Sequence, residues 1–455
     1  MYSGIKDLPK QNMLTLFHLD RLLPCSMAMS GLVFFMIGCA TPKTAVDYID
    51  GTEVMYAPVM AATADDAHHE KFNVAVQLFL PGADLDKLEV EGAGVITTDE
   101  SGTPNINHKA VDPKIRRLET HFFPIALKNS LDKSSQWGQT FVSPGEVQSA
   151  DVYVRANILA SDGHSIALLI YAVDSTGRVW FNETIEYKTQ ELDYQSANWP
   201  ERDPYDAVFN HINNKLVEVR NSLTADEQRK IRLVSEMRFA SDLAPDAFEN
   251  YLARDAKNRL YVQRFPAESD PNYQIIQQLQ GTELDMLSHI EEYYNDLYQG
   301  VYDPYSTWRE QFRQLSIEME QYRVDAQNQK TSSILAGVLF VAVAGGSDSY
   351  QSGNSYGVAQ SAALLVGGIQ LSAAMYEAAK EKIEIANLKA KELSEISVAA
   401  GEGMQPKVIE LEGRTYQLTG DVEDRFRQIR DIIRKRYLLE TGQEDLVPDD
   451  SAGAL

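Results

Sequence analysis

Apolar and polar residues alternate along four stretches of the chain, and this period of two predicts half-buried β-strands. In the first stretch, Phe72, Val74, Val76 and Leu78 alternate with more polar or smaller residues. The other three are separated by turns at 161–163 and 174–177, and the first turn contains Asp162-Gly163. Because Asp-Gly between apolar runs is a strong hairpin signal, we expect a β-meander. Its strands are expected at 151–160, 165–173 and 178–187.

A helix and a short strand are expected before this meander. Asp112-Pro113 marks the start of the helix, with the aspartate at the cap and the proline in the first turn. The short strand is expected at 139–143. This order, β-α-β followed by a meander, predicts a small α+β domain over 71–200.

From about residue 203, apolar residues recur at helical spacing and predict a mainly α-helical domain over 201–302. Asp303-Pro304 marks another helix start, after which Trp308, Phe312 and Leu315 begin a heptad seam. A second seam returns over 358–393 and predicts a long antiparallel helical hairpin at 303–400. In the preceding domain, helices are expected at 203–223, 225–240, 245–256 and 280–299.

The outer half of this hairpin, residues 334–375, is its most apolar part. In one interpretation, helices from 203–300 cover it and it is ordinary core. In the other, it is exposed and docks a partner helix or dips into a membrane. As a helix, the apolar run 334–344 would be roughly 17 Å long against about 30 Å of hydrocarbon, so it cannot span a bilayer alone. The candidate contact residues are Leu335, Val338, Leu339, Phe340, Leu364, Leu365 and Ile369.

An apolar run near the amino terminus ends in Met36-Ile37-Gly38-Cys39. It has the layout of a bacterial secretory signal, too short for a membrane span and closed by small residues at a cleavage site. The sequence resembles the lipobox of bacterial lipoproteins, with Met36 where that family usually has leucine. The resemblance implies cleavage between Gly38 and Cys39 and a diacylglycerol on the Cys39 thiol. We therefore expect a signal peptide at 1–38 and a lipidated flexible tether at 39–70. The alternative is a buried apolar strand with a structural cysteine.

The chain is strongly acidic, with a formal net charge of −24. Such a surface repels nucleic-acid phosphates and anionic lipid headgroups, so no nucleic-acid partner is expected. Membrane attachment is expected to rest on the acyl chains. In Gram-negative lipoproteins, Ala40 after the cysteine resembles the outer-membrane sorting pattern. This resemblance implies a lipid-anchored protein of the outer membrane that faces the periplasm. With Cys25 in the discarded segment, no disulfide is expected.

The element order over 71–190 is similar to a small periplasmic domain found in several envelope proteins. It resembles the amino-terminal domain of the Tol translocation protein, the curli-secretion lipoprotein and auxiliary lipoproteins of ABC-type lipid transporters. The resemblance is one of topology together with the turn residues at 161–163 and 174–180. It implies no functional residue.

Candidate catalytic groups are few in this sequence. His68-His69-Glu70 has metal-ligating residue types, but two adjacent histidines need further fixed ligands to hold a metal. Ser355 lies in a Gly/Ser/Asn loop expected between helices, without the strand that precedes a serine nucleophile elbow. We therefore expect no catalytic residue, no metal and no cofactor.

The carboxy-terminal segment 401–445 is expected to contain a β-hairpin and a helix that begins at Asp421. The hairpin strands are expected at 407–411 and 414–418. The helix carries a locally basic stretch, expected to pair with acidic neighbours of the same protein, the alternative being an acidic partner surface. Its basic residues are Arg425, Arg427, Arg430, Arg434, Lys435 and Arg436.

These features predict an envelope lipoprotein that acts as a non-catalytic binding or scaffolding component. Its expected partners are the membrane, through the anchor, and an envelope protein. One alternative is an oligomeric component of a transport or secretion assembly that uses 334–375 to dock a partner or a membrane. A second alternative is a cell-wall or lipid hydrolase, which would require a polar cleft with convergent histidine, serine or carboxylate groups.

Overall fold

The structure is a computed structural model of the whole chain. The residues that it describes are 46–49, 59–82, 96–98, 104–106, 113–195, 203–267, 269–332, 364–366, 369–371, 388, 391–393, 395, 407–411 and 414–443.

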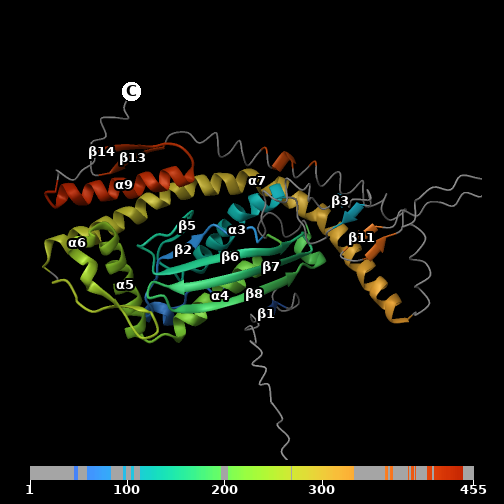
Figure 1. Cartoon of the computed structure of the whole chain (residues 1–455), viewed down its shortest axis with the longest axis horizontal. Coiled ribbons are helices and arrows are strands. Elements are labelled where there is room, and N and C mark those ends of the chain that lie inside the picture. Colours follow the sequence, from blue (N-terminus) through green and yellow to red (C-terminus); the bar gives the residue numbers. More distant parts are fainter. Residues whose placement is uncertain are drawn as a thin grey trace, which may run out of the picture. The chain divides into compact units, whose positions relative to one another are not determined.

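A mixed β-sheet with the strand order β1-β8-β7-β6-β2-β5 organises the fold (Figure 1). β6, β7 and β8 form the antiparallel meander that the alternating pattern predicts. β2 lies between β5 and β6 and runs parallel to both, because the helix between β2 and β5 returns the chain to the same end of the sheet. The strands are β1 (Val46–Ile49), β2 (Val74–Gln77), β5 (Thr140–Ser143), β6 (Val152–Ser161), β7 (Ser165–Asp174) and β8 (Val179–Lys188).

One face of this sheet packs against three helices. Alternate strand residues such as Val74, Val154 and Leu168 are fully buried there, as the period of two predicts. Trp308 and Phe312, from the predicted heptad seam, belong to the same core. The helices are α3 (Pro113–Ser134), α4 (Asp206–Ser222) and α7 (Pro271–Ser332).

A second hydrophobic cluster joins two further helices to the β2–β5 side of the sheet and to α7. Ile429 and Ile433 of the carboxy-terminal helix are buried in it, and this helix lies along α7 (Figure 1). Residues from the predicted segments 71–200 and 201–302 thus share both clusters. The two helices are α5 (Ala225–Leu243) and α9 (Val422–Glu440), and α9 follows the hairpin of β13 (Lys407–Leu411) and β14 (Arg414–Leu418).

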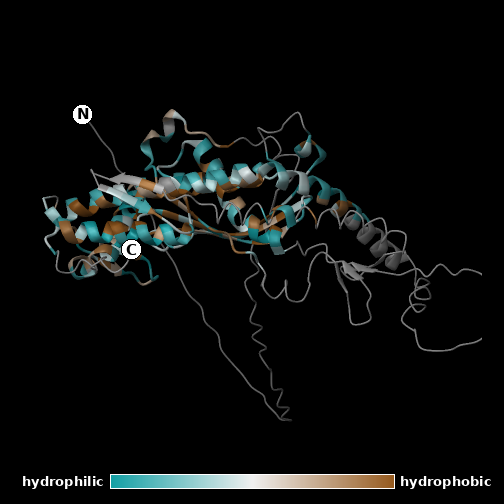
Figure 2. Ribbon diagram, turned by 90° about the horizontal axis from the view of Figure 1, so that it is seen from above, coloured by the Kyte–Doolittle hydropathy of each residue, from teal (hydrophilic) through white to brown (hydrophobic). Residues whose placement is uncertain are grey.

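The predicted α+β class is confirmed: a sheet with a meander is followed by a mainly helical region that contains a long helix. Hydrophobic and hydrophilic residues alternate along the helices and strands of this region (Figure 2). Among the described residues, no helix combines the length and the apolar character needed to cross a membrane.

The helix expected at 245–256 is wrong after its first turn. α6 (Pro245–Phe248) ends quickly, and β9 (Leu252–Arg254) then pairs with β10 (Leu260–Val262) as an antiparallel hairpin. The helix start expected at Asp303 is also wrong, because α7 continues through Pro304. Figure 1 shows that α7 changes direction partway along its length, which is a common effect of a proline inside a helix.

The second arm of the helical hairpin was expected over 358–393. This prediction is wrong at 364–366 and 369–371, where the structure has strands. β11 (Leu364–Val366) and β12 (Ile369–Leu371) are antiparallel strands, with Val366 opposite Ile369. The sequence between them is Gly367-Gly368, a dipeptide typical of two-residue β-hairpins. β11 also pairs with β4 (Pro104–Ile106), which pairs with β3 (Ile96–Thr98). Helical residues are described at 388, 391–393 and 395.

Candidate functional site

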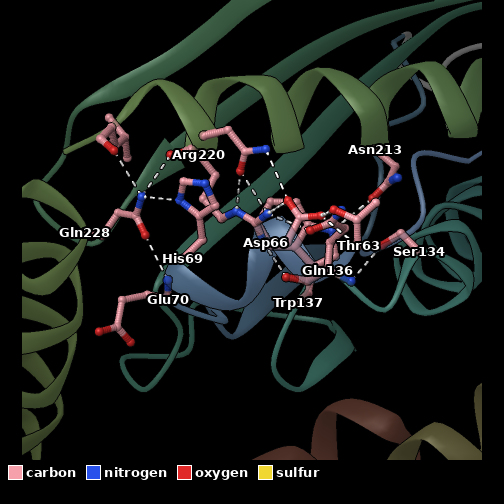
Figure 3. Close-up of polar contacts among 12 residues, drawn as sticks. Thr63, Asp66, His69, Glu70, Ser134, Gln136, Trp137, Asn213, Arg220 and Gln228 are labelled. Carbon is pink, nitrogen blue, oxygen red and sulfur yellow. Dashed lines mark hydrogen bonds and ion pairs between the residues drawn. The ribbon is translucent and has the colours of Figure 1, made fainter. Parts of the chain in front are cut away.

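Residues 59–70, expected to belong to a flexible tether, instead lie on the surface of the sheet-and-helix body (Figure 3). The backbone N–H of Met60 donates to Oδ1 of Asn214 at 2.7 Å, and that of Ala62 donates to the carbonyl of Ser134 at 2.8 Å. A short 3₁₀ helix, Ala64–His68, follows. The segment is therefore held through its backbone to both α3 and α4.

The hydrogen bonds that cap this 3₁₀ helix hold the carboxylate of Asp66 in place and favour its ionised form. The backbone N–H and the hydroxyl of Thr63 donate to Oδ2 of Asp66 at 2.7 and 2.8 Å, in the spacing of a capping box. These hydrogen bonds, with smaller contributions from Gln136 and Arg220, lower the pKa of Asp66 to about 2. Asp66 is consequently a fixed negative charge that faces the end of α4.

Arg220, in the last turn of α4, is the cation opposite this carboxylate. Its side chain is 1% exposed, and its Nη2 lies 3.5 Å from Oδ1 of Asp66. The guanidinium also donates to the backbone carbonyl of Gln136 and, at 2.6 Å, to Oε1 of the same residue. Its carbon Cζ lies 5.2 Å from the centre of the Trp137 ring. Burial lowers the pKa of Arg220, and the charge of Asp66 opposes that shift.

The end of α3 presents Gln136 and Trp137 to this arginine. Ser135 has a positive φ of 56°, and this left-handed residue ends the helix and turns the chain. Trp137 is fixed by a hydrogen bond from its Nε1 to Oδ1 of Asn213 on α4, at 2.9 Å. The arginine is thus enclosed by a planar amide on one side and an indole ring on the other.

Gln228 of α5 holds the other end of the segment. Its Oε1 accepts the backbone N–H of Glu70 at 2.8 Å, and its Nε2 lies 2.8 Å from Nδ1 of His69. The same Nε2 donates to the carbonyl of Leu223 at 3.0 Å, so Gln228 also caps the carboxyl end of α4. We call Asp66, Gln136, Trp137, Arg220 and Gln228 the docking network.

The docking network can bind and orient a chain, but its groups are arranged as ion pair, amide contacts and caps rather than as an acid–base pair. His69 is engaged by Gln228, while His68 is exposed. Within the part of the chain that the structure describes, no three His, Cys, Asp or Glu side chains are placed to hold a metal ion.

A buried ion pair lies deeper in the body. Arg309 of α7 donates from both terminal nitrogens to the carboxylate of Asp203, at 2.8 and 2.5 Å. Glu119 of α3 accepts from Oγ of Ser161 and from the hydroxyl of Tyr305, both at 2.7 Å. Burial raises the pKa of Glu119. These groups tie α7 to α3 and to the segment before α4.

Two buried aspartates fix the ends of strands. Asp151 accepts the backbone N–H of Asn73 at 2.7 Å and pairs with Arg232 at 2.9 Å, and burial raises its pKa to about 6. Asp162 accepts the backbone N–H groups of His164 and Ser165 in the turn of the β6–β7 hairpin. Burial raises its pKa to about 6 as well. Both carboxylates hold backbone donors in place.

Glu283 of α7 is a third buried carboxyl group, and it lines a cavity of 250 Å³ between α5 and α9. It accepts a hydrogen bond from Oγ of Ser149 at 2.5 Å. Burial raises its pKa to about 7, while Arg430 lowers it and Asp242 raises it further. The cavity is also lined by Arg427, Arg430 and Arg434.

The basic stretch of α9 pairs within the chain at three positions, as predicted. Arg427 pairs with Asp424, Arg430 with Asp242 at 2.5 Å, and Arg436 with Glu440 at 2.7 Å. Two of these partners are on α9 itself, and Asp242 belongs to α5.

The residues singled out from the sequence are only partly described. Gly38, Cys39, Leu335, Val338, Leu339 and Phe340 lie outside the described residues. Leu364 and Leu365 belong to β11 and Ile369 to β12, so these three positions are not on a helical arm. Their contact with a partner or a membrane stays a prediction.

Sequence reasoning missed the docking network, because its members come from four separate segments. A local signal was present: Thr63 and Asp66 have capping-box spacing, as do Thr224 and Glu227 before Gln228. Two capping boxes indicate two ordered helix starts, although not that they meet. Comparison with protein-family models, with characterised proteins and with solved structures finds no match for this chain.

Proposed function

We propose that this chain is a lipid-anchored, periplasm-facing lipoprotein of the bacterial outer membrane that acts as a non-catalytic binding or scaffolding component. The anchor is assigned to Cys39, the last residue of Met36-Ile37-Gly38-Cys39. Acyl chains at this cysteine would attach the protein to a membrane in spite of its overall net charge of −24.

The observation that best supports this proposal is the early docking of the chain that would follow the anchor. β1 begins at Val46 and pairs in parallel with β8 at the edge of the sheet. Residues 40–45 would then connect Cys39 to β1, and the seven residue steps from Cys39 to Val46 span at most about 25 Å. An acylated Cys39 would therefore keep the folded body close to the bilayer surface, because the connecting segment is short.

The docking network supports a positioning role for the segment after β1. Asp66 and His69 are held by Arg220 and Gln228, from two different helices. Asp151 and Asp162 serve backbone donors at strand ends, which is a structural use of buried carboxylates. These arrangements favour a rigid body that presents surfaces to a partner.

Fractionation of the native chain beside two cysteine variants tests the proposal. Wild type and Cys25→Ala are expected in the outer-membrane fraction, because Cys25 would be removed with the signal peptide. Cys39→Ala is expected outside that fraction, without lipid. Equal membrane association of all three proteins would refute the lipid anchor.

A further inference from the structure

The hairpin of β9 and β10 is locally basic, whereas the chain as a whole is acidic. Residues 250–265 contain the single acidic residue Asp255, against a formal net charge of −24 for the whole chain. The loop 255–259 turns at Asn258, which has a positive φ of 61°. The basic residues of this stretch are Arg254, Lys257, Arg259 and Arg264.

Asp255 is the one carboxylate of this stretch, and after its backbone hydrogen bonds the charges of Arg259 and Lys257 help to lower its pKa, so four cations share a single acidic group. Arg254 donates to the carbonyl of Asn258 at 2.9 Å, and the guanidinium of Arg264 lies 5.1 Å from the ring centre of Tyr251. The carboxylate of Asp255 accepts hydrogen bonds from the backbone N–H groups of Lys257 and Arg259, both at 2.8 Å. The positive charge of the hairpin is thus available to an external anion.

Two aromatic side chains stand beside this charge. Tyr261 is 44% exposed and Phe265 is 61% exposed. They are the only aromatic residues among the exposed large apolar side chains in the described part of the chain. Exposed aromatic rings next to arginine and lysine are the residue types found where proteins meet a membrane–water interface.

A mainly apolar groove of 580 Å³ runs between the hairpin and α5. Its apolar lining includes Ile231 and Val234 from α5, with Leu260 and Val262 from β10. Its charged lining has both signs: the cations are Arg178, Lys230 and Arg259, and the carboxylates are Asp174, Glu227 and Asp255. The groove is therefore mainly apolar with charges of both signs in its lining, and the excess of positive charge belongs to the hairpin at 250–265.

The groove lies close to the docked segment. Gln228 holds His69 and Glu70, and Lys230 and Ile231 follow it within the same turn of α5. The hairpin and the segment 59–70 thus both lie against the amino-terminal half of α5.

We propose that the β9–β10 hairpin and the groove behind it bind anionic phospholipid at a bilayer surface. The cations would contact headgroup phosphates, Tyr261 and Phe265 would lie at the interface, and the groove would receive part of an acyl chain. A bilayer is preferred over an acidic protein segment because of the aromatic side chains. This preference also rests in part on the proposed function, in which the anchor brings a membrane within reach.

Vesicle flotation with the full-length Cys39→Ala protein tests this without a lipid anchor. The vesicles contain phosphatidylcholine alone or phosphatidylcholine with phosphatidylglycerol, and binding is expected to require the anionic lipid. A charge reversal, Lys230→Glu with Arg259→Glu, is expected to weaken binding at least about tenfold. Phe265→Ser, at a 61% exposed position, is expected to weaken binding while leaving the thermal midpoint unchanged.

A matched control places the same change of charge elsewhere in the chain: Arg427→Glu with Arg434→Glu on α9. The apolar run at 31–40 is common to all these proteins, so their differences report the hairpin. Absence of binding to either vesicle, equal binding to both, or equal loss in hairpin and control variants would overturn the assignment. So would a photo-crosslinker at Tyr261 that captures a protein and no lipid in the envelope. Because Cys39 is absent from the experiment, failure here would leave the anchor itself untouched.

Discussion

The guanidinium of Arg220 lies 3.5 Å from the carboxylate of Asp66, and this contact joins the amino-terminal segment to the end of α4. Gln136 and Trp137 enclose the same guanidinium from the end of α3. A segment that the sequence presents as a linker is therefore part of the folded body. If Cys39 is acylated, this docking also determines how the body is presented at the membrane.

Replacing Arg220 by methionine is expected to lower the free energy of unfolding by about 3 kcal/mol. The substitution keeps apolar bulk beside Trp137 but leaves buried acceptors on Gln136 without a donor. Denaturant unfolding measures the change, and limited proteolysis should show new cleavage within 59–70. Arg229→Met is the control, because Arg229 and its partner Asp226 are both exposed. Equal effects of the two substitutions would contradict a specific role for Arg220.

Asp66→Asn is expected to lower the free energy of unfolding at neutral pH and to have little effect on it in acid. The pKa of Asp66 is lowered to about 2 in the folded chain from an ordinary 3.8. Its ionised form therefore contributes stability above about pH 4, and this contribution is lost as the pH falls toward 2. The difference in unfolding free energy between wild type and Asp66→Asn should shrink over that range. A difference that stays constant with pH would show that the charge of Asp66 is not what stabilises the segment.

Glu283 is expected to give the protein a stability that falls as the pH rises toward neutral. Its pKa is raised to about 7 in the folded chain from an ordinary 4.5, so the folded state binds the proton more tightly than the unfolded state. The stabilising contribution is present below about pH 4.5 and is lost as the pH passes 7. Thermal midpoints from pH 5 to 8 should fall less for Glu283→Gln than for wild type. Glu310→Gln, at an exposed position of the same helix, should follow the wild type. Parallel curves for all three proteins would disprove the assignment.

Breaking the Arg309–Asp203 pair from one side is expected to be costly. Arg309→Met leaves a buried carboxylate without its cation and should lower the unfolding free energy by about 4 kcal/mol. Adding Asp203→Asn removes the orphaned charge and should restore part of that loss, which a double-mutant cycle measures. Arg313→Met is the comparison one turn later, since its partner Glu191 is 75% exposed. A double variant whose loss equals the sum of the single losses would contradict direct coupling.

The strands of the sheet could be predicted because their signal is local. Alternation places the meander strands within one or two residues of β6, β7 and β8, and the turn at Asp162-Gly163 is where it was expected. The hairpin 407–411 and 414–418 is reproduced for the same reason. In each case neighbouring residues determine the element, and the partner strand follows within a few residues.

Other elements depend on contacts between distant residues. Leu252–Arg254 follows a valid helix start at Pro245 but becomes a strand, because Leu260–Val262 offers a ladder of hydrogen bonds. The helical interpretation of 364–371 followed the spacing of apolar residues and overlooked Gly367-Gly368 as a turn signal. Asp66 lies in the segment predicted as a tether, and no local pattern indicates its contact because its partner Arg220 lies on a helix far along the chain.

The most direct test of the proposed function is the intact mass of the mature chain purified from bacterial membranes. The expected mass is that of a chain that begins at Cys39 and carries a diacylglycerol on its thiol. Such a result would establish the lipid anchor. The short segment between Cys39 and β1 would then limit how far the folded body lies from the bilayer. A chain that retains residues 1–38, or that begins elsewhere with an unmodified thiol at Cys39, would contradict the account.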